Sequence, residues 1–236
     1  MALGGPGACL PVHGHLGFIQ GSSTANHEGP RMADRACALV GVDESGTGAW
    51  AGPFTVCAYA SRAGDDLELI RLGAKDSKKL TDKRRRACFD DLASFAMAAH
   101  CSVVEVEDIR RVGLRQAWRE AVVNSILSVV SIVGPSEITV DGNADSWVRQ
   151  HLSKQIGTLS FAPKADENVP VVGAASILAK TIRNDRMIDL HNVYPEYGWD
   201  RNFGYGSPEH ETILNKIGKT EQHRPWKNLE AISLRS

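Results

Sequence analysis

The chain has 236 residues, a formal net charge of -1, and 42% hydrophobic and 23% charged residues. This ordinary globular composition excludes disorder of the whole chain, and no run approaches the roughly 20 uninterrupted apolar residues of a membrane-spanning helix. The near-neutral charge argues against a nucleic-acid binder that works by bulk positive charge, although it leaves room for a local basic patch.

Residues 1–36 differ in composition from the rest of the chain. They are rich in Gly, Pro, Ser and His and have no hydrophobic periodicity. Such a segment has too little apolar surface to bury, so we expect a disordered leader over residues 1–36 and one folded domain over residues 37–236.

The cysteines are odd in number, widely spaced and without a CxxC pair: they are Cys9, Cys37, Cys57, Cys88 and Cys101. This pattern fits neither a disulfide framework nor a thiolate zinc site. We therefore expect a reducing compartment and buried free thiols, above all at Cys57, which lies in an apolar run.

From residue 37 onward, short apolar runs alternate with amphipathic stretches, which is typical of an α/β or α+β protein. Strands are expected at residues 38–43, 55–60, 101–106 and 137–141, with a short strand within 160–172. The first two strands are expected to pair as a hairpin across a Gly-rich turn. Helices are expected from the N-cap Thr81 to about residue 98, at 109–132 with an interruption at Gly113, at 174–191 and at 208–217.

Carboxylates end two of the expected strands. Asp43 and Glu44 close the first, and Asp141 closes the strand at 137–141. In open sheets, ligands gather outside the carboxyl ends of strands, and clustered carboxylates need a cation such as Mg²⁺ or Mn²⁺ to relieve their repulsion. Each acid taken singly is more often an ordinary turn or cap residue. The coincidence at two strand ends favours a metal site for phosphoryl transfer.

Three further segments are suited to a nucleic acid. Gly46, Thr47 and Gly48 present backbone N–H groups with little obstruction, although a lone Gly-x-Gly is usually just a turn. Residues 75–86 hold seven basic and two acidic residues, a local charge of +5, although a charge run is usually a solvated helix start. Tyr205, between two glycines, could stack on a base or sugar or simply pack on the domain edge.

Taken in order, six motifs resemble those of the ribonuclease HII family, closest to its bacterial form. They are GVDESGTGAWAGP (41–53), DSKKL (76–80), ITVDGN (138–143), ASILAK (175–180), YPEYG (194–198) and GYGSPEH (204–210). The resemblance spans about residues 38–226 and implies an α/β, ribonuclease H-like mixed β-sheet flanked by helices, with a C-terminal helical portion.

The same resemblance implies a hydrolase. It would be an endonuclease that cuts the RNA strand of RNA–DNA hybrids, or cuts 5′ to ribonucleotides embedded in duplex DNA, and leaves 3′-hydroxyl and 5′-phosphate ends. It would use one or two Mg²⁺ or Mn²⁺ ions and serve ribonucleotide excision in DNA replication and repair. The expected enzyme is cytoplasmic, monomeric and without membrane association.

The resemblance also assigns roles to individual residues. Asp43, Glu44 and Asp141 match the family's metal-binding carboxylates. The positions that match substrate-binding residues are Gly46, Thr47, Gly48, Ser77, Lys78, Lys164 and Tyr205. Tyr205 matches the tyrosine that stacks on the sugar, the glycine loop matches the sensor of the ribose 2′-hydroxyl, and Asp166 with Lys164 matches a second loop near the active site.

Two departures bear on activity. Thr47 stands where the family usually has Arg or Lys, so a cationic contact is missing. The resemblance puts a fourth carboxylate at position 184, where this chain has Asn184 followed by Asp185. We expect one of these two residues to complete the catalytic set. The rival hypotheses are a catalytically weakened RNA–DNA hybrid-binding protein and, in another class, an unrelated two-metal phosphoryl-transfer enzyme such as a phosphatase or a DNA strand-transferase.

Overall fold

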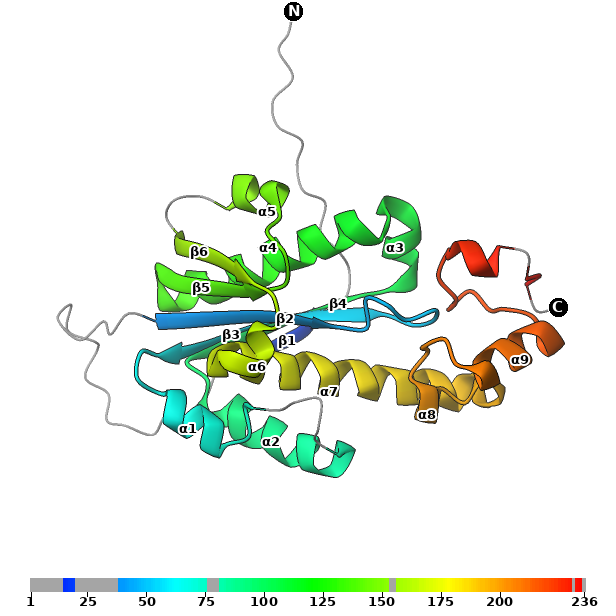
Figure 1. The fold of residues 1–236 in the computed structure, drawn as a ribbon, viewed down its shortest axis with the longest axis horizontal. Helices are drawn as coiled ribbons and strands as arrows, with labels where there is room; N and C mark the ends of the chain where they lie inside the picture. The colour runs from blue at the N-terminus through cyan, green and yellow to red at the C-terminus, as the bar shows by residue number, and fades with distance from the viewer. Residues whose placement is uncertain (1–14, 20–37, 76–80, 153–155, 231, 235–236) are drawn as a thin grey trace, which may run out of the picture.

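The computed structural model describes residues 15–19, 38–75, 81–152, 156–230 and 232–234. Its centre is a mixed sheet with the strand order β1-β4-β3-β2-β5-β6, covered by helices on both faces (Figure 1). The strands are β1 (His15–Ile19), β2 (Ala38–Ser45), β3 (Phe54–Arg62), β4 (Ala98–Val104), β5 (Ser136–Asp141) and β6 (Gly157–Ala162). The expected fold class, a mixed sheet flanked by helices, is confirmed.

The sheet has an antiparallel half and a parallel half that meet at β2. β3 pairs antiparallel with both β2 and β4, as the expected hairpin requires. On its other side β2 pairs parallel with β5, and β5 pairs parallel with β6. The carboxyl ends of β2, β5 and β6 therefore lie along the same edge of the sheet, where open α/β sheets bind their ligands.

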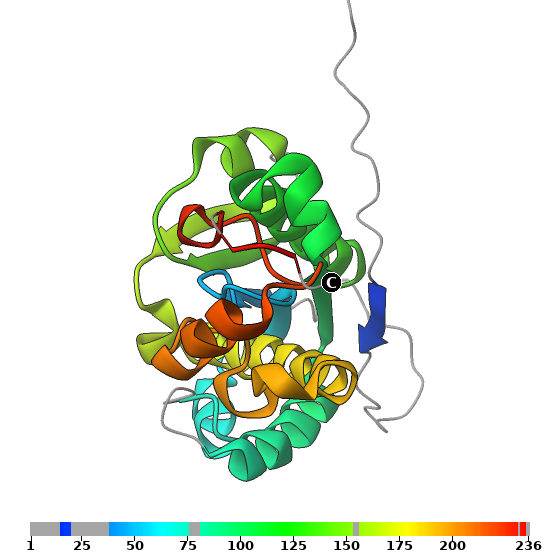
Figure 2. The same cartoon turned by 90° about the vertical axis from the view of Figure 1, so that its right-hand side faces the viewer.

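The helices divide between the two faces and the C-terminal end (Figures 1 and 2). They are α1 (Asp66–Arg71), α2 (Asp82–Phe95), α3 (Val106–Val112), α4 (Leu114–Val133), α5 (Ser146–His151), α6 (Ala165–Asn168), α7 (Pro170–Val193), α8 (Trp199–Asn202) and α9 (Pro208–Ile217), with 3₁₀ turns at Pro195–Tyr197 and Lys227–Leu229. α3, α4 and α5 cover one face, α1, α2 and α7 cover the other, and α8 and α9 lie beyond the sheet. In the described ranges, no helix is both long and apolar enough to cross a membrane.

Local sequence signals explain several helix boundaries. The Thr81 hydroxyl accepts a hydrogen bond from the Arg84 backbone N–H, so Thr81 caps α2 as expected. Gly113, with a φ of 83°, separates α3 from α4. This left-handed conformation suits glycine, and it breaks the expected 109–132 helix into two.

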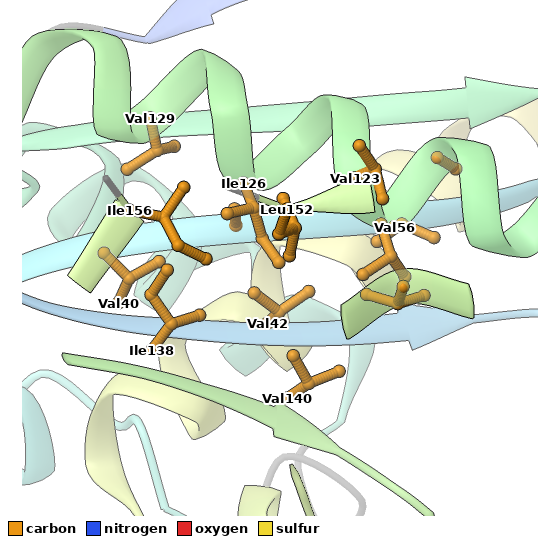
Figure 3. Close-up of a cluster of buried hydrophobic side chains, with 14 of the residues drawn as sticks. Val40, Val42, Val56, Val123, Ile126, Val129, Ile138, Val140, Leu152 and Ile156 are labelled. Carbon is orange, nitrogen blue, oxygen red and sulfur yellow. The ribbon is translucent and has the colours of Figure 1, made fainter. Parts of the chain in front are cut away.

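Two hydrophobic clusters hold the helices onto the sheet. On one face, Val40, Val42 and Val56 of the sheet pack under Ile126 and Val129 of α4 (Figure 3). On the opposite face a second cluster joins β3 and β4 to α2 and α7. Both faces of the central strands are buried, so they consist of nearly continuous apolar runs without a clear alternation.

The backbones of α7 and the central strand β2 lie close together. A Cβ placed on Gly41 of β2 would lie 2.4 Å from the backbone of Val171 and Val172 in α7. A Cβ on Gly173 would lie 1.8 Å from the Ala74 carbonyl oxygen. Only glycine permits backbones to approach this closely, so Gly41 sets how deeply α7 sits on the sheet, and Gly173 sets how closely α7 approaches the loop that follows α1.

Two expectations differ from the structure. Cys57 is buried but is not a free thiol, because it forms a disulfide with Cys101. The two residues face each other on the antiparallel strands β3 and β4, with Cα atoms 4.1 Å apart. This register joins positions 44 residues apart in the sequence and could not be read from cysteine spacing. Cys88 is the buried free thiol among the described cysteines; Cys9 and Cys37 lie outside them.

The expected leader contains one strand. Residues His15–Ile19 form β1, which pairs antiparallel with β4 at the edge of the sheet, and this differs from the disorder expected of these five residues. Residues 1–14 and 20–37 lie outside the described ranges, and the division of the chain at residue 37 stays a prediction.

Replacement of Gly41 by alanine tests the α7–β2 contact. The added methyl would meet backbone atoms at 2.4 Å, so the free energy of unfolding in urea is expected to fall by about 1–3 kcal/mol. Gly48→Ala is the matched control, because a Cβ there meets nothing within 4 Å, and its effect is expected to stay within about 0.5 kcal/mol. Equal stability of the two variants would contradict the tight α7–β2 packing.

Candidate active site

A hollow of about 270 Å³ lies at the edge where the parallel strands end. Four carboxylates reach it from three strand ends: Asp43 and Glu44 from β2, Asp141 from β5, and Asp166, which follows the end of β6 by four residues. The full lining is Asp43, Glu44, Ser45, Gly46, Thr47, Asp141, Asp166, Ser176, Lys180 and Tyr205. The sheet topology thus brings together the three acids expected from strand ends and adds a fourth.

Asp43 is the most deeply buried of the β2 acids in this pocket, with 6% of its surface exposed. Its Oδ1 accepts a hydrogen bond from the Glu44 backbone N–H at 2.8 Å. Burial, together with the negative charges of Glu44 and Asp141, raises the pKa of Asp43 to about 8, although hydrogen bonds from Ser176 and from the Glu44 backbone act in the opposite direction. The pocket therefore stabilises a neutral Asp43 unless a positive charge enters.

Neighbouring elements hold the other carboxylates in place. The Trp118 indole N–H, on α4, donates to Glu44 Oε2 at 3.2 Å, and the Ala165 backbone N–H, on α6, donates to Asp141 Oδ1 at 2.6 Å. Burial is the main cause that raises the pKa of Glu44, followed by the charges of Asp141 and Asp166. Trp118 escaped the sequence analysis because it lies 74 positions from Glu44 and carries no motif.

The donor chemistry of the pocket fits a hard divalent cation. Carboxylate oxygens are the ligands that Mg²⁺ and Mn²⁺ prefer. The pKa values of Asp43 and Glu44 are raised first by burial and then by neighbouring negative charge, and a bound cation would oppose both effects. Within the described ranges, no three or more acidic, His or Cys side chains already stand in a metal-ligating arrangement.

The structure places Asn184 and Asp185 outside the carboxylate pocket, where one of them was expected to complete the carboxylate set. Both residues line a different hollow, between α7 and α2, together with Arg85 and Arg86. Asp185 forms an ion pair with Arg86 there. Residue 184 falls on a part of α7 that lies beyond the pocket, whereas Lys180, about one turn earlier, and Ser176, about two turns earlier, line the pocket.

Asp166 takes the position that was expected of residue 184. Its side chain is 4% exposed and lines the carboxylate pocket, and its charge acts on Glu44. The signal that identifies it is the rule already used for β2 and β5, applied to β6: a carboxylate that follows the end of a parallel strand.

Two buried arginines donate hydrogen bonds to the backbone of the Gly-rich turn at residues 46–53, which contains the glycine loop at residues 46–48. Arg183 donates from Nε to the Pro53 carbonyl at 3.1 Å and from Nη2 to the Phe203 carbonyl at 2.7 Å. Arg224 donates from Nη1 to the Thr47 carbonyl and from Nε to the Gly52 carbonyl, each at 2.9 Å. Burial lowers the pKa of both guanidinium groups, that of Arg224 to about 9. Because both guanidinium groups bond to carbonyls of the Gly-rich turn, their positive charge lies next to the backbone of that turn.

The loop also depends on the glycine at position 46. Gly46 has a φ of 91°, and a Cβ there would meet the Arg183 side chain at 1.8 Å. Beside it, the Arg183 guanidinium lies 5.0 Å from the centre of the Tyr205 ring, which is 43% exposed. Gly46, Thr47 and Tyr205 therefore line one wall of the carboxylate pocket, as expected.

The remaining expected substrate residues have different outcomes. Gly48 and Lys164 are exposed and do not line the pocket, although Lys164 lies two residues before Asp166. Ser77 and Lys78 lie outside the described residues. In the described part of the basic run, Lys75, Lys83, Arg84 and Arg86 are exposed and Arg85 is buried. The exposed cations stay candidates for contact with a phosphate backbone.

Comparison with known proteins agrees with this geometry. The sequence model of the ribonuclease HII family matches residues 40–229. A ribonuclease HII of Ralstonia nicotianae is 35% identical over 187 residues, which cover 79% of this chain and 75% of that protein. A ribonuclease HII of Helicobacter pylori is 33% identical over 187 residues, which cover 79% and 89%.

Solved structures show the same fold. The ribonuclease H2 of Pyrococcus horikoshii superposes with a TM-score of 0.70 and 26% identity, over 81% of this chain and 95% of that one. The family match spans most of the chain and includes every carboxylate of the pocket. The chain therefore belongs to the ribonuclease HII family, a family of ribonuclease H hydrolases.

Proposed function

We propose that this chain is a divalent-metal-dependent endonuclease that cuts the RNA strand of RNA–DNA hybrids, or cuts 5′ to a ribonucleotide embedded in duplex DNA. The observation that carries the proposal is the convergence of four carboxylates from three parallel strand ends on one pocket, beside a glycine loop and an exposed tyrosine. Family membership supports ribonuclease H endonuclease activity on RNA–DNA substrates.

The carboxylates of the pocket would hold the metal. The ribonuclease H family depends on divalent ions, and a ribonuclease HIII has been solved in complex with Mn²⁺. Asp43, Glu44, Asp141 and Asp166 would ligate one or two Mg²⁺ or Mn²⁺ ions. Such ions, when bound, activate the attacking water and stabilise the leaving 3′-oxygen. Trp118 and the α6 backbone orient Glu44 and Asp141 for this ligation.

The opposite wall of the pocket would recognise the substrate. The backbone around Gly46 and Thr47 would meet the ribose 2′-hydroxyl, the group that distinguishes RNA from DNA. Tyr205, backed by Arg183, would stack on the neighbouring sugar. Because Thr47 is uncharged, the buried guanidinium groups of Arg183 and Arg224 supply the positive field behind the loop.

Catalysis is favoured over hybrid binding without turnover. The case for a weakened enzyme rested on Asn184 and Thr47, and Asn184 lies outside the carboxylate pocket. A pocket with four carboxylates does not need residue 184 for its negative charge. We propose further, as the family resemblance implies, that the enzyme is a cytoplasmic monomer that serves ribonucleotide excision during DNA replication and repair.

Substitution of Asp166 by asparagine separates the two candidates for the fourth carboxylate. We expect Asp166→Asn to lower kcat by about 100-fold or more, because it removes a negative charge from the metal-binding set. Asp185→Asn is the matched control and is expected to stay within about two-fold, since it only breaks an exposed ion pair. The measurement is gel-resolved cleavage of a duplex with one embedded ribonucleotide. A larger loss in Asp185→Asn would refute the assignment of Asp166.

Metal binding should depend on pH through Asp43. The pKa of about 8 in the folded chain lies above the ordinary value of 3.8, so ionisation of Asp43 lowers the free energy of unfolding as pH rises from about 4 to 8. A divalent ion binds the ionised form, so Mn²⁺ is expected to raise Tm more at pH 8 than at pH 6. Thermal melts with and without Mn²⁺ measure the effect. Asp43→Asn should remove most of the pH dependence of the Mn²⁺-induced rise in Tm. An equal rise in Tm at pH 6 and pH 8 in the unmodified chain would contradict the role of Asp43 in metal binding.

Two substitutions of Tyr205 test the stacking wall. Tyr205→Ala removes the ring and is expected to raise KM for the embedded-ribonucleotide duplex by about 10-fold. Tyr205→Phe keeps the ring and is expected to stay within about two-fold. Steady-state kinetics measures both, with an all-DNA duplex as the negative substrate. A similar loss in both variants would assign the effect to the hydroxyl and would rule out stacking.

A further inference from the structure

Two buried histidines lie behind the loop that carries Tyr205. His210 is 0% exposed and His223 is 1% exposed, and their rings pack against Tyr197 and Trp199. The Nε2 atoms of the two rings lie 3.2 Å apart. Neither ring lines the carboxylate pocket, so the proposed chemistry does not account for this pair.

The surroundings determine which nitrogen of each ring carries the proton. His223 Nδ1 lies 2.9 Å from the Thr220 backbone N–H, which can only donate, so Nδ1 is the acceptor and the proton is on Nε2. His210 Nδ1 lies 3.0 Å from the Tyr205 carbonyl oxygen, which can only accept, so Nδ1 carries the proton there.

The contact between the rings agrees with both assignments. His223 Nε2–H donates to His210 Nε2, which is left as an acceptor by the proton on its Nδ1. The Trp199 indole N–H, a donor only, also points at His210 Nε2, at 3.5 Å. The three hydrogen bonds therefore run in one direction, from the Thr220 backbone through His223 and His210 to the Tyr205 carbonyl.

We propose that His223 and His210 form a neutral hydrogen-bond relay that fixes the Tyr205 backbone, and that both are positioning residues for substrate binding. The relay bonds to the Tyr205 backbone carbonyl, while the Arg183 guanidinium contacts the Tyr205 ring. The Asn202 side chain accepts a hydrogen bond from the backbone N–H of Gly204, the residue before Tyr205. The consequence for substrate rests on the proposed function, whereas the relay itself does not.

The relay works only while both rings are neutral. A second proton on His210 would put two N–H donors face to face at Nε2, and one on His223 would oppose the Thr220 N–H. Burial lowers the pKa of both rings, that of His223 to about 3. The charged groups that act on the pair are Glu209 on His210, and Lys219 and Arg110 on His223. The rings therefore stay neutral at the pH of the cell.

The first test reads the tautomers in the unmodified chain. Long-range ¹⁵N–¹H correlation spectra of the full-length protein at pH 7 distinguish a protonated Nδ1 from a protonated Nε2 in each ring. We expect His210 as the Nδ1–H tautomer and His223 as the Nε2–H tautomer. A protonated Nε2 on His210, or a doubly protonated ring in either residue, would overturn the relay whatever the enzyme cleaves.

The second test connects the relay to Tyr205 through a double-mutant cycle. His223→Asn keeps an acceptor near the Thr220 N–H but removes the Nε2–H donor. We expect it to raise KM for the embedded-ribonucleotide duplex by about three- to ten-fold with kcat nearly unchanged, and to change KM by less than about two-fold in a Tyr205→Ala background. His151→Asn, at an exposed histidine on α5, is the matched control.

The outcomes separate this inference from the proposed function. If His223→Asn lowers kcat and raises KM by the same factors in both backgrounds, its role is structural and positioning of Tyr205 is refuted. If Tyr205→Ala alone leaves KM unchanged, the substrate role of Tyr205 fails, and the tautomers still decide the relay.

Discussion

The contact of α7 with the central strand β2 is the constraint on which the rest of the structure depends. At Gly41 the two backbones approach so closely that a single methyl group would not fit. α7 then runs across the sheet and brings Ser176 and Lys180 to the carboxylate pocket. About two turns after Ser176 it brings Arg183 to the Pro53 carbonyl, at the end of the Gly-rich turn. A helix seated higher on the sheet would leave these side chains short of their partners.

Charge is separated within a chain that is almost neutral as a whole. Carboxylates collect at one edge of the sheet, where burial and mutual repulsion raise the pKa values of Asp43 and Glu44. Behind the glycine loop, Arg183 and Arg224 are buried against backbone carbonyls. Acidic groups that prefer a cation thus face a wall with a positive field. This arrangement suits a site that must hold metal ions and a phosphodiester together.

C-terminal segments, which are distant in the sequence, form backbone hydrogen bonds with the Gly-rich turn. The Trp50 and Ala51 backbone N–H groups donate to the Gly204 carbonyl, and the Arg224 backbone N–H donates to the Trp50 carbonyl at 2.7 Å. These bonds join the glycine loop to the loop of Tyr205 and to the segment of His223. The proposed histidine relay acts in the same way, because His210 and His223 fix the Tyr205 backbone although neither lines the pocket.

Much of the fold and part of the site follow from local sequence. Apolar runs bounded by glycines and carboxylates identify β2, β3 and β5, and the Thr81 cap and Gly113 mark helix boundaries. The strand-end rule identifies Asp43, Glu44 and Asp141, because a strand's direction determines where its end lies. These features depend on neighbours along the chain, which the sequence displays directly.

Only the tertiary structure decided which distant residues meet. It placed Asp166 in the carboxylate set and left Asn184 and Asp185 beside α2, because the helical turn sends residue 184 past the pocket. It joined Cys57 to Cys101 through strand register, Trp118 to Glu44, and His223 to His210. The sequence by itself determined the acids, the glycines and the family. The packing of α7 and the C-terminal segments determined their partners, since contacts across 13 to 177 positions depend on geometry that no local pattern encodes.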